Sequence, residues 1–388
     1  MLIPISNTAR NYAWGSTTLI AELQGREPSP EPEAEIWFGD HPGSPSRVDD
    51  GTGRPLDRAL AEAGVEPLPY LLKILAAATS LSIQAHPSRV EAAAGFAREE
   101  AAGIPRDADH RLYRDENHKP EIIVALSDRF RALVGLRPLA DTQRLVASLG
   151  DGVGLDAFAE ALQPANDEDE SATLHRVLGW ALSGEASDVV DGLAAALSAE
   201  FGDAAAEFAA ERSVLARIAA EFPGDPGLIV ATLMNLVELR RGEALFAPAG
   251  VLHAYQDGLG VELMAASDNV LRGGLTPKHV DVPELLRIVD THTGPAPVIE
   301  PTPVAAGVSS YDAGVSDFRL ARVEASFESV TEIALSGTAI VLAASGDVVV
   351  EADGDRVELV PGTAVVVVAD SVAIGGAGEA FVAQPGLD

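Results

Sequence analysis

Residues 69–87 have the sequence PYLLKILAAATSLSIQAHP, an apolar run that ends with polar side chains at alternate positions. Successive side chains of a β-strand point to opposite faces, so a strand here would place Ser82, Gln84 and His86 on one face and the residues between them on the other. A hydroxyl, an amide and an imidazole would then converge in an apolar setting. The stretch predicts a β core that carries a polar site.

The size and composition of the chain fit a globular protein of two or three domains. It has 388 residues, of which 47% are hydrophobic and none is cysteine. Without cysteine, disulfides are excluded and a metal ion would have only nitrogen and oxygen ligands. The first residues lack the basic start and apolar core of a signal peptide, and no apolar run reaches the length of a membrane span. We therefore expect a soluble, cytoplasmic protein.

The net charge of −32 restricts the partners of this chain. Nucleic acid and anionic membrane surfaces both require a basic face, so neither is expected as a partner. A sugar phosphate would also be repelled unless cations gather locally. Lys73, Lys119 and Lys278 are the three lysines of a chain whose other basic residues are arginine. Each marks a place where a compact ammonium could be needed, with chance retention as the alternative.

The first half of the chain predicts β structure followed by helices. Residues 1 to about 135 predict short strands and turns, with a helix at 88–102 where Ser88 and Glu91 form a capping-box pattern. From 139 to 240 the patterning is alanine-rich and helical, as in DVVDGLAAALSAEF and GLIVATLMNLVEL, around an acidic loop. This segment is expected to be a helical insertion packed on the β part.

The tail predicts a second β unit. Strands resume at GEALFAPAGVLHAY, and a proline-rich linker at 295–303 precedes a strand-dense region with a hairpin between Gly346 and Asp355. The segments GEALFAPAGVLHAYQDG and DRVELVPGTAVVVVADS share a pattern of strand, Pro-Gly turn and strand. Where the first copy has His253, the second has valines. The repeat predicts two related β-barrels, one with a polar site and one without.

Four residues are candidate metal ligands. Imidazole, carboxylate and amide groups suit zinc or a similar divalent ion, and such groups stand at Gln84, His86, Glu121 and His253. For each histidine alone, a hydrogen-bonded core residue is the alternative. Three other histidines have no partner at a suggestive spacing and are expected at the surface or in structural roles: His110, His175 and His292.

Two further segments carry charged residues that could do chemistry. In DENHKPE, Lys119 and Glu121 would share one face of an extended stretch, with a charged hairpin turn as the alternative. In GVELMAASDNVLRGGLTPKHVD, Arg272 precedes two glycines that allow a ligand or backbone to approach closely. An arginine held there could face an anion or an enediolate, and an irregular loop with a surface arginine is the alternative.

Several long motifs in the same order resemble the type I mannose-6-phosphate isomerases over about residues 5 to 290. The motifs are NYAWGS (11–16), EIWFGDHPGSPS (35–46), LLKIL with LSIQAHP (71–87), DENHKPE (115–121), PAGVLHAY (248–255) and VELMAASDNVLRGGLTPKHVDV (261–282). His279 and the acidic, alanine-rich helical segment depart from the family pattern, but neither is a ligand position.

The resemblance implies a mainly β fold with a helical domain: two cupin-type (jelly-roll) β-barrels plus an α-helical insertion. The catalytic unit would comprise residues 1–138 and 241–295, with the helical domain at 139–240. Residues 296–388 would form a cupin-like β domain without a metal site. The resemblance further implies one zinc ion per chain and a small-molecule sugar phosphate as its partner. We expect a monomer.

The resemblance also implies roles for individual residues. The zinc ligands carried over by motif are Gln84, His86, Glu121 and His253. Arg272 matches the active-site arginine, and Lys119 and His118 match residues proposed for proton transfer and ring opening. Four more positions match residues that line the same pocket: Lys73, Ser82, Glu262 and Lys278.

The implied reaction interconverts mannose 6-phosphate and fructose 6-phosphate by proton transfer through an enediol or enediolate, supplying mannose metabolism. Lys119 or a zinc-associated group would move the proton while Arg272 stabilises the enediolate. The alternative is that Lys119 and Lys278 mainly bind the anionic substrate. A metal-assisted hydride shift typically uses paired metals. Because the sequence shows one set of metal ligands, proton transfer is favoured over a hydride shift. A sugar-binding regulator or an iron oxygenase on a similar barrel is the competing class.

Overall fold

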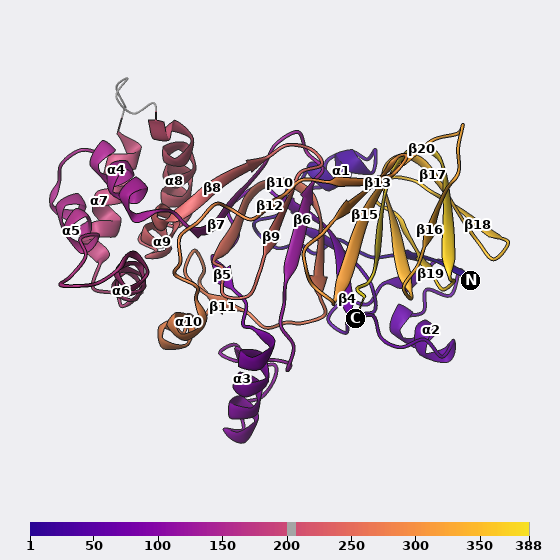
Figure 1. Cartoon of the computed structure of the whole chain (residues 1–388), viewed down its shortest axis with the longest axis horizontal. Coiled ribbons are helices and arrows are strands. Elements are labelled where there is room, and N and C mark those ends of the chain that lie inside the picture. The colour runs from indigo at the N-terminus through magenta and orange to yellow at the C-terminus, as the bar shows by residue number, and fades with distance from the viewer. Residues whose placement is uncertain (200–206, 388) are drawn as a thin grey trace.

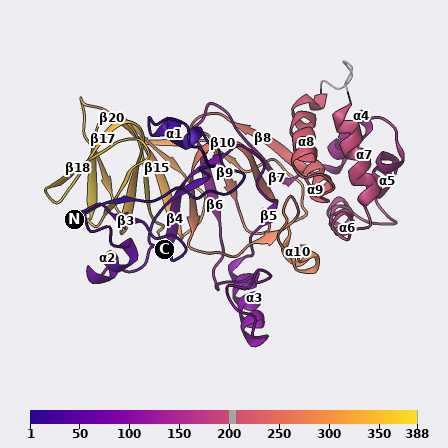
Figure 2. The ribbon, with the colours of Figure 1, turned by 180° about the vertical axis from the view of Figure 1, so that it is seen from behind.

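The computed structural model describes residues 1–199 and 207–387. The molecule is elongated, with helices of residues 139–233 at one end and the strands of the C-terminal tail at the other (Figure 1). Seen from behind, the N-terminus lies beside those C-terminal strands, far from the helical end (Figure 2). The end of the alanine-rich pattern, at residues 200–201, lies outside the described residues. No helix in the described ranges is long and apolar enough to cross a membrane.

One antiparallel sheet, here called the central sheet, occupies the middle of the molecule. Its strands are β2 (Glu35–Phe38), β4 (Tyr70–Ala77), β5 (Gln84–Ala85), β6 (Glu121–Ala125), β7 (Phe130–Leu136), β8 (Met234–Leu239), β9 (Ala244–Ala247), β10 (His253–Ala265), β11 (Leu271–Arg272) and β12 (Val298–Ile299). The long strand β10 pairs with β5 and β7 along its first half and with β4 and β6 along its second. Its register shifts between Tyr255 and Asp257.

A second antiparallel sheet, here called the C-terminal sheet, packs beside the first. Its strands are β1 (Leu2–Ser6), β3 (Arg47–Val48), β13 (Thr302–Ala305), β14 (Val308–Tyr311), β15 (Phe318–Ala325), β16 (Thr331–Ala334), β17 (Ala339–Ala352), β18 (Asp355–Leu359), β19 (Ala364–Val367) and β20 (Ser371–Pro385). The expected hairpin is confirmed as β17–β18, because Ala352 pairs with Asp355 across a turn. The linker expected at 295–303 includes β12 and the start of β13.

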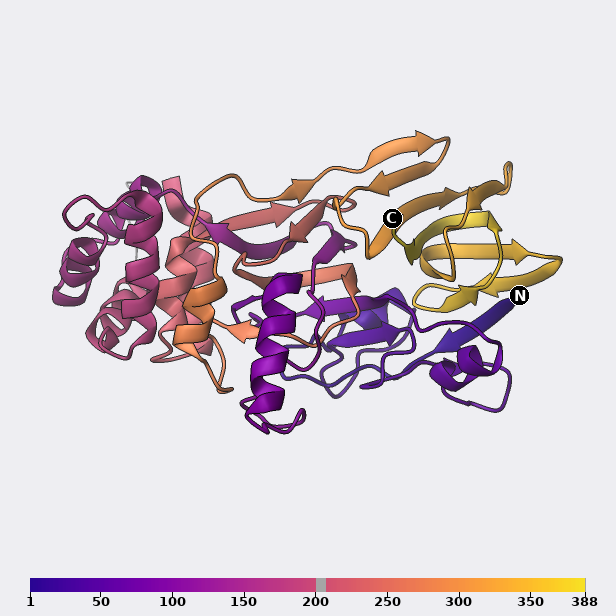
Figure 3. The same cartoon turned by 60° about the horizontal axis from the view of Figure 1, so that its bottom comes forward.

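The N-terminal strands belong to the C-terminal sheet. β1 pairs antiparallel with β19 and with β3, so the chain begins in the second sheet before it enters the first. Figure 3 shows the N-terminal strand next to the strands of the tail. The expected grouping of residues 1–138 with the catalytic unit therefore differs from the hydrogen bonding of β1 and β3. Short local sequence patterns cannot show with which distant strand the edge strand of a sheet will pair.

The alternation of β4 explains both the apolar run and the site. Leu72 and Ile74 pack between the two sheets, in one cluster with Leu342 and Phe381 of the C-terminal sheet. Lys73, on the opposite face, lines a cavity inside the central sheet. Every residue of β4 is buried because both of its faces are covered. The apolar run at residues 70–77 is thus a strand with one face in the hydrophobic core between the two sheets and the other face at the cavity.

The helical end of the molecule contains α4 (Leu139–Ser148), α5 (Val153–Ala161), α6 (Glu170–Leu182), α7 (Ser187–Ser198), α8 (Ala209–Glu221) and α9 (Gly227–Leu233). The expectation of helix through GLIVATLMNLVEL is wrong for its second half, because α9 ends at Leu233 and β8 begins at Met234. β8 pairs with β7, and Asn235 donates to the carbonyl oxygens of Val134 and Leu136. This pairing outweighs local helix propensity.

Four further helices flank the sheets: α1 (Leu19–Leu23), α2 (Leu56–Glu62), α3 (Arg89–Ala101) and α10 (Val282–Ile288). The expected helix after SIQAHP is confirmed as α3. Its N-cap Ser88 accepts from the backbone N–H of Glu91, and the Glu91 carboxylate accepts in return from that of Ser88. The capping box fixes where the chain turns away from the site.

Candidate metal centre and its cavity

Strands β5, β6 and β10 bring the predicted metal ligands together. Gln84 on β5 pairs in register with His253, the first residue of β10, and His86 follows directly after β5. Glu121 opens β6, which pairs with the opposite half of β10. A register shift bends a strand, and β10 has one between its two halves. Ligand atoms of His86, Glu121 and His253 lie within 4.8 Å of one another.

The stretch 81–87 is not the continuous strand that its alternation predicts. β4 ends at Ala77, and within the stretch only Gln84 and Ala85 are strand. The alternation holds over residues 82–85, because Ser82 and Gln84 line the cavity while Ile83 and Ala85 are fully buried, but Leu81 also lines the cavity.

The two histidines are oriented as metal ligands usually are. His86 Nδ1 lies 2.8 Å from the carbonyl oxygen of Asn269, and His253 Nδ1 lies 3.0 Å from that of Val251. A carbonyl only accepts, so each Nδ1 carries a proton, and in the neutral form of each ring the lone pair is on Nε2. Both rings are fully buried, and burial lowers the pKa of His86 to about 4. Both rings therefore direct Nδ1–H at a carbonyl oxygen and Nε2 at the centre of the site, where a neutral imidazole would offer its lone pair to a metal ion.

The buried atoms at this centre fit a divalent metal ion. His86 Nε2 and His253 Nε2 lie 3.3 and 3.2 Å from the two Glu121 oxygens. Within the described part of the chain, both Nε2 atoms and Glu121 Oε2 have no hydrogen-bond partner of acceptable geometry. Buried polar atoms without partners are costly, and a shared cation would satisfy all three. Two neutral imidazoles, a carboxylate and the nearby Gln84 amide form a nitrogen and oxygen set suited to zinc.

Lys119 sets the charge of this carboxylate. Its ammonium lies 2.7 Å from Glu121 Oε1, and the lysine is 8% exposed. Burial alone would raise the pKa of Glu121, but the neighbouring Lys119 ammonium brings that pKa well below its ordinary value. Glu121 is therefore ionised, as a metal ligand must be.

A second buried ion pair lines the same interior. Lys73 Nζ lies 2.9 Å from Glu262 Oε2 and 3.7 Å from Glu35 Oε1, and β4 and β10 place Lys73 and Glu262 opposite each other. Burial would lower the pKa of Lys73, but the carboxylates of Glu262, Glu35 and Glu121 raise it above its ordinary value. Lys73 is thus a fixed cation among carboxylates.

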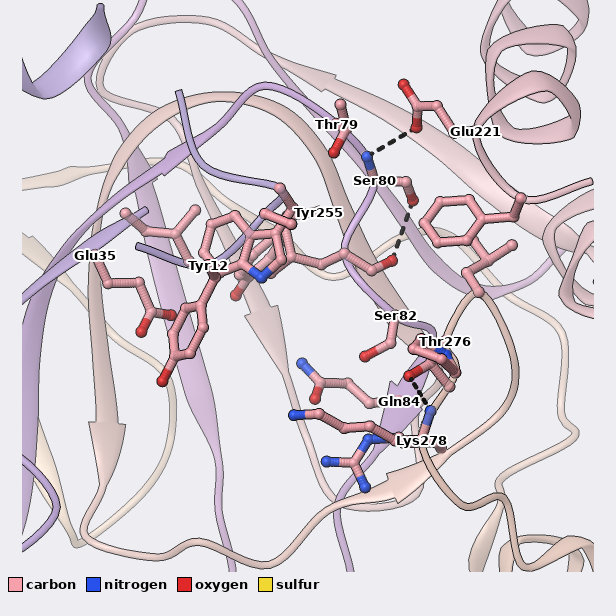
Figure 4. Close-up of a pocket in the computed structure, with 18 of the residues that line it drawn as sticks. Tyr12, Glu35, Thr79, Ser80, Ser82, Gln84, Glu221, Tyr255, Thr276 and Lys278 are labelled. Atoms are coloured by element: carbon pink, nitrogen blue, oxygen red, sulfur yellow. Dashed lines mark hydrogen bonds between the residues drawn. The ribbon is translucent and has the colours of Figure 1, made fainter. Parts of the chain in front are cut away.

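The metal centre lies in the wall of a cavity of about 620 Å³. Figure 4 shows Ser82, Gln84 and Lys278 gathered on one side of it, with Tyr12 and Glu35 on another. The structure brings eight of the predicted site residues to this cavity: Lys73, Ser82, Gln84, Lys119, Glu121, Glu262, Arg272 and Lys278.

Cations concentrate at one part of the cavity despite the acidic chain. Arg272 pairs in register with Gln84, next to the metal centre. Burial lowers the pKa of Arg272, and the neighbouring Arg114 adds to the effect. The pKa of Lys278 is also lowered, by burial and then by Arg272 and Arg114. Cations that repel one another in a half-buried place favour the binding of an anion.

His118 lies away from this site. It does not line the cavity, and its Nε2 lies 2.8 Å from Asp317 Oδ2 and 2.9 Å from an Arg89 nitrogen. The expected role in ring opening therefore has no support from its position. The side chain contacts Arg89 of α3 and Asp317, the residue before β15, whereas the neighbouring Lys119 lines the cavity. His110, His175 and His292 are exposed, as expected.

Several cavity residues were not identified from the sequence. They include Tyr12, Trp14, Glu35, Thr79, Ser80, Glu221, Phe222, Tyr255 and Thr276. Tyr12 and Trp14 belong to the motif NYAWGS and Glu35 to EIWFGDHPGSPS, but the types and spacing of these residues indicate no particular chemistry. Glu221 and Phe222 come from the end of α8, where the helical pattern carries no sign of a site.

Fold and site together define a mainly β protein with a divalent metal centre beside a cation-lined cavity. Residues 2–139 match the family model of the phosphomannose isomerase type I catalytic domain. The chain is 36% identical over 394 residues to mannose-6-phosphate isomerase of Salmonella typhimurium, with 97% of each chain covered. It is 37% identical over 381 residues to the Escherichia coli enzyme, with 94% of each covered.

The fold agrees with a solved structure of the same family. The Salmonella typhimurium enzyme, bound to its substrate fructose 6-phosphate and zinc, superposes with a TM-score of 0.86, at 34% identity and full coverage of both chains. The chain belongs to the type I mannose-6-phosphate isomerase family.

Proposed function

We propose that this protein is a zinc-dependent aldose–ketose isomerase that interconverts mannose 6-phosphate and fructose 6-phosphate. The observation that carries the proposal is the convergence of His86, Glu121 and His253 beside the cavity lined by Lys119 and Arg272. Three buried atoms of this group have no hydrogen-bond partner among the described residues. The name of the relatives and the fructose 6-phosphate and zinc of the Salmonella enzyme supply the substrate and the metal.

Four residues would hold the zinc ion: Gln84, His86, Glu121 and His253. When bound, zinc would polarise the carbonyl and hydroxyl oxygens at C1 and C2, which makes the proton between them easier to move. The ligand set has both neutral and charged members. With Glu121 ionised and the histidines neutral, it would leave a net positive charge at the metal.

Two residues of the chain would carry the chemistry. Lys119 lines the cavity and would act as the free amine, after its ammonium has given up one proton: it would take the proton from one of the two substrate carbons and return it to the other, through an enediolate. Arg272, beside Gln84, would stabilise the negative charge of the enediolate oxygen. In the alternative, Lys119 and Lys278 bind the anionic substrate and Lys119 moves no proton.

The remaining cavity residues would bind the sugar phosphate. Lys278 and Arg272 form the cation cluster that a phosphate needs in a chain with a net charge of −32. Ser82 would donate to a substrate hydroxyl, and Lys73 with Glu262 would form a fixed polar wall. His118 is outside the cavity lining and is not part of the proposed catalytic set.

We further propose that the two sheets are cupin-type (jelly-roll) barrels. The repeat supports this, since β9 and β10 surround a turn at Gly250 as β18 and β19 surround one at Gly362, with φ angles of 79° and 80°. The proposed units are 1–138 with 241–295, 139–240 and 296–388, except that β1 and β3 complete the C-terminal sheet. The working protein would be a cytoplasmic monomer that supplies mannose metabolism.

The test is turnover of mannose 6-phosphate in deuterium oxide. Proton transfer through an enediolate predicts fructose 6-phosphate that contains solvent deuterium at C1. Product without deuterium would contradict an exchanging base and favour a hydride shift. Absence of any product from the zinc-loaded protein would overturn the isomerase itself.

A further inference from the structure

Residues 221–227, from the last residue of α8 to the first residue of α9, form a turn that connects the helical end of the molecule to the cavity. Glu221 and Phe222, at its start, line the cavity. Two carboxylates of this turn, those of Glu221 and Asp225, accept hydrogen bonds from backbone N–H groups of two different cavity loops. We call it the clamp turn.

Asp225 holds the loop that carries Lys278. Its Oδ1 accepts from the N–H groups of Gly227 at 2.7 Å and Leu275 at 3.0 Å, and its Oδ2 accepts from that of Thr276 at 3.1 Å. Thr276 Oγ1 in turn accepts from the N–H of Lys278 at 3.1 Å. A single side chain therefore fixes the path of the backbone up to the cation of the cavity.

The backbone of this loop is strained and needs hydrogen bonds that keep it in its conformation. Leu275 has a φ of 55°, in the left-handed region that a branched, non-glycine residue rarely adopts. Gly274 has a φ of 118°, and a Cβ there would collide with Gly227 of the clamp turn. A strained conformation persists only where its surroundings fix it, and the bonds to Asp225 lie at this place.

Glu221 holds the opposite loop. Its carboxylate accepts from the N–H of Ser80 at 3.2 Å, as Figure 4 shows. Ser80 lies two residues before Ser82 and four before Gln84. The loops are also joined to each other, because Gly273 N–H donates to the Ile83 carbonyl at 2.8 Å and Ile83 N–H to the Gly274 carbonyl at 3.1 Å. The clamp turn thus hydrogen-bonds to both cavity loops, which are also hydrogen-bonded to each other.

We propose that Asp225 is a positioning residue that orients Lys278 and Thr276 toward the phosphate of the substrate, with Glu221 supporting the facing loop. This inference rests on the proposed function for the identity of the substrate. It gives the helical end a role in the site: the helices supply the clamp turn, which shapes the anion-binding side of the cavity.

The sharpest test is Asp225→Asn, which keeps the size of the side chain. The amide oxygen can still accept from Gly227 and Leu275, but the amide NH₂ faces the N–H of Thr276 and cannot accept from it. We expect KM for mannose 6-phosphate to rise about tenfold with kcat within about twofold, because binding is weakened equally in ground and transition states. The inhibition constant of inorganic phosphate should rise by the same factor.

The matched control is Asp169→Asn, another helical-end aspartate, whose Oδ1 accepts from Ala172 N–H at the start of α6. It should leave both constants unchanged. The inference is overturned if Asp225→Asn leaves KM and the phosphate inhibition constant within about twofold of wild type, or lowers kcat with KM unchanged. Asp225→Glu, which restores the charge, should recover part of the loss.

Two further measurements keep the test decisive. If the variant does not fold, hydrogen exchange on the wild type reads the amides of Leu275 and Thr276 directly; strong protection supports the clamp and rapid exchange overturns it. If the wild type shows no turnover, the proposed function fails. Calorimetric titration of wild type and Asp225→Asn with inorganic phosphate then still tests the clamp, which predicts weaker binding to the variant and is contradicted by equal binding.

Discussion

The ammonium of Lys119 lies 2.7 Å from a carboxylate oxygen of Glu121, and both side chains are buried. Glu121 also faces the Nε2 atoms of His86 and His253. The proposed proton carrier and the proposed metal ligands thus share one carboxylate, so loss of the carrier can be separated from loss of the metal only by measuring both.

Lys119→Met should lower kcat by about 10²–10⁴-fold, because a positioned acid–base group contributes that much. Zinc content should stay at the wild-type level, since the substitution removes no ligand. Steady-state kinetics and metal analysis on the same preparation check this. An intact kcat with only KM raised would assign Lys119 to substrate binding instead.

Removing one imidazole should release the metal. His253→Ala is expected to weaken zinc binding by more than about 100-fold, since even the partners of ligands matter by 10–100-fold. Competition with a chromophoric chelator measures the affinity. The control is His175→Ala, an exposed histidine whose Nε2 contacts the Leu286 carbonyl. Equal zinc affinity in His253→Ala and wild type would contradict the assignment of the metal centre.

The acid stability of the α3–α10 contact should depend on Glu284. Burial would raise its pKa, but Arg287, Tyr113 and Arg98 bring the pKa of Glu284 down to about 2. A lowered folded pKa stabilises the protein above the ordinary value of about 4.5, and this stability is lost as pH falls toward 2.

Glu284→Gln should therefore cost roughly 1 kcal/mol at pH 7, a figure reduced for solvent screening, and progressively less below pH 4. Urea unfolding at several pH values gives the difference from wild type. Glu160→Gln, an exposed glutamate on α5, serves as the control. A difference for Glu284→Gln that does not shrink in acid would refute the pKa assignment.

The hydroxyl of Tyr70 should stabilise the contact between the two sheets. This hydroxyl lies 3.0 Å from the carbonyl oxygens of Ala383, in β20, and of Thr338, the residue before β17. Tyr70→Phe leaves those carbonyls without this buried donor, so we expect a loss of about 1–2 kcal/mol. Denaturant unfolding followed by two probes measures it. A change below about 0.3 kcal/mol would mean that this contact contributes little.

Local sequence patterns correctly predicted the structural features that depend on neighbouring residues. The capping box at Ser88 and Glu91 located α3, and the turn at Asp353–Gly354 located the β17–β18 hairpin. The motif residues His86, Glu121 and His253 also came together as expected. Their side chains could be identified because ligand chemistry limits the residue types and because the motifs are long.

Features that depend on contacts between residues far apart in the sequence could not be predicted from local sequence patterns. Helical patterning continued through Met234–Leu239, yet this segment pairs with β7 as a strand. His118 stands next to Lys119, but Asp317, far away in the sequence, holds its ring outside the cavity lining. Asp225 has no signature in a turn rich in proline and glycine. Its importance follows from the N–H groups of Leu275 and Thr276, which only the folded chain brings near.

The most direct test of the central claim is isomerase activity as a function of zinc. Protein stripped with a chelator would be titrated with zinc while conversion of mannose 6-phosphate to fructose 6-phosphate is followed in a coupled assay. Activity should be absent at first, rise in proportion to zinc and level off at about one ion per chain, as a single four-ligand site requires. Stoichiometric zinc binding without turnover would contradict the account and indicate a fold retained for binding.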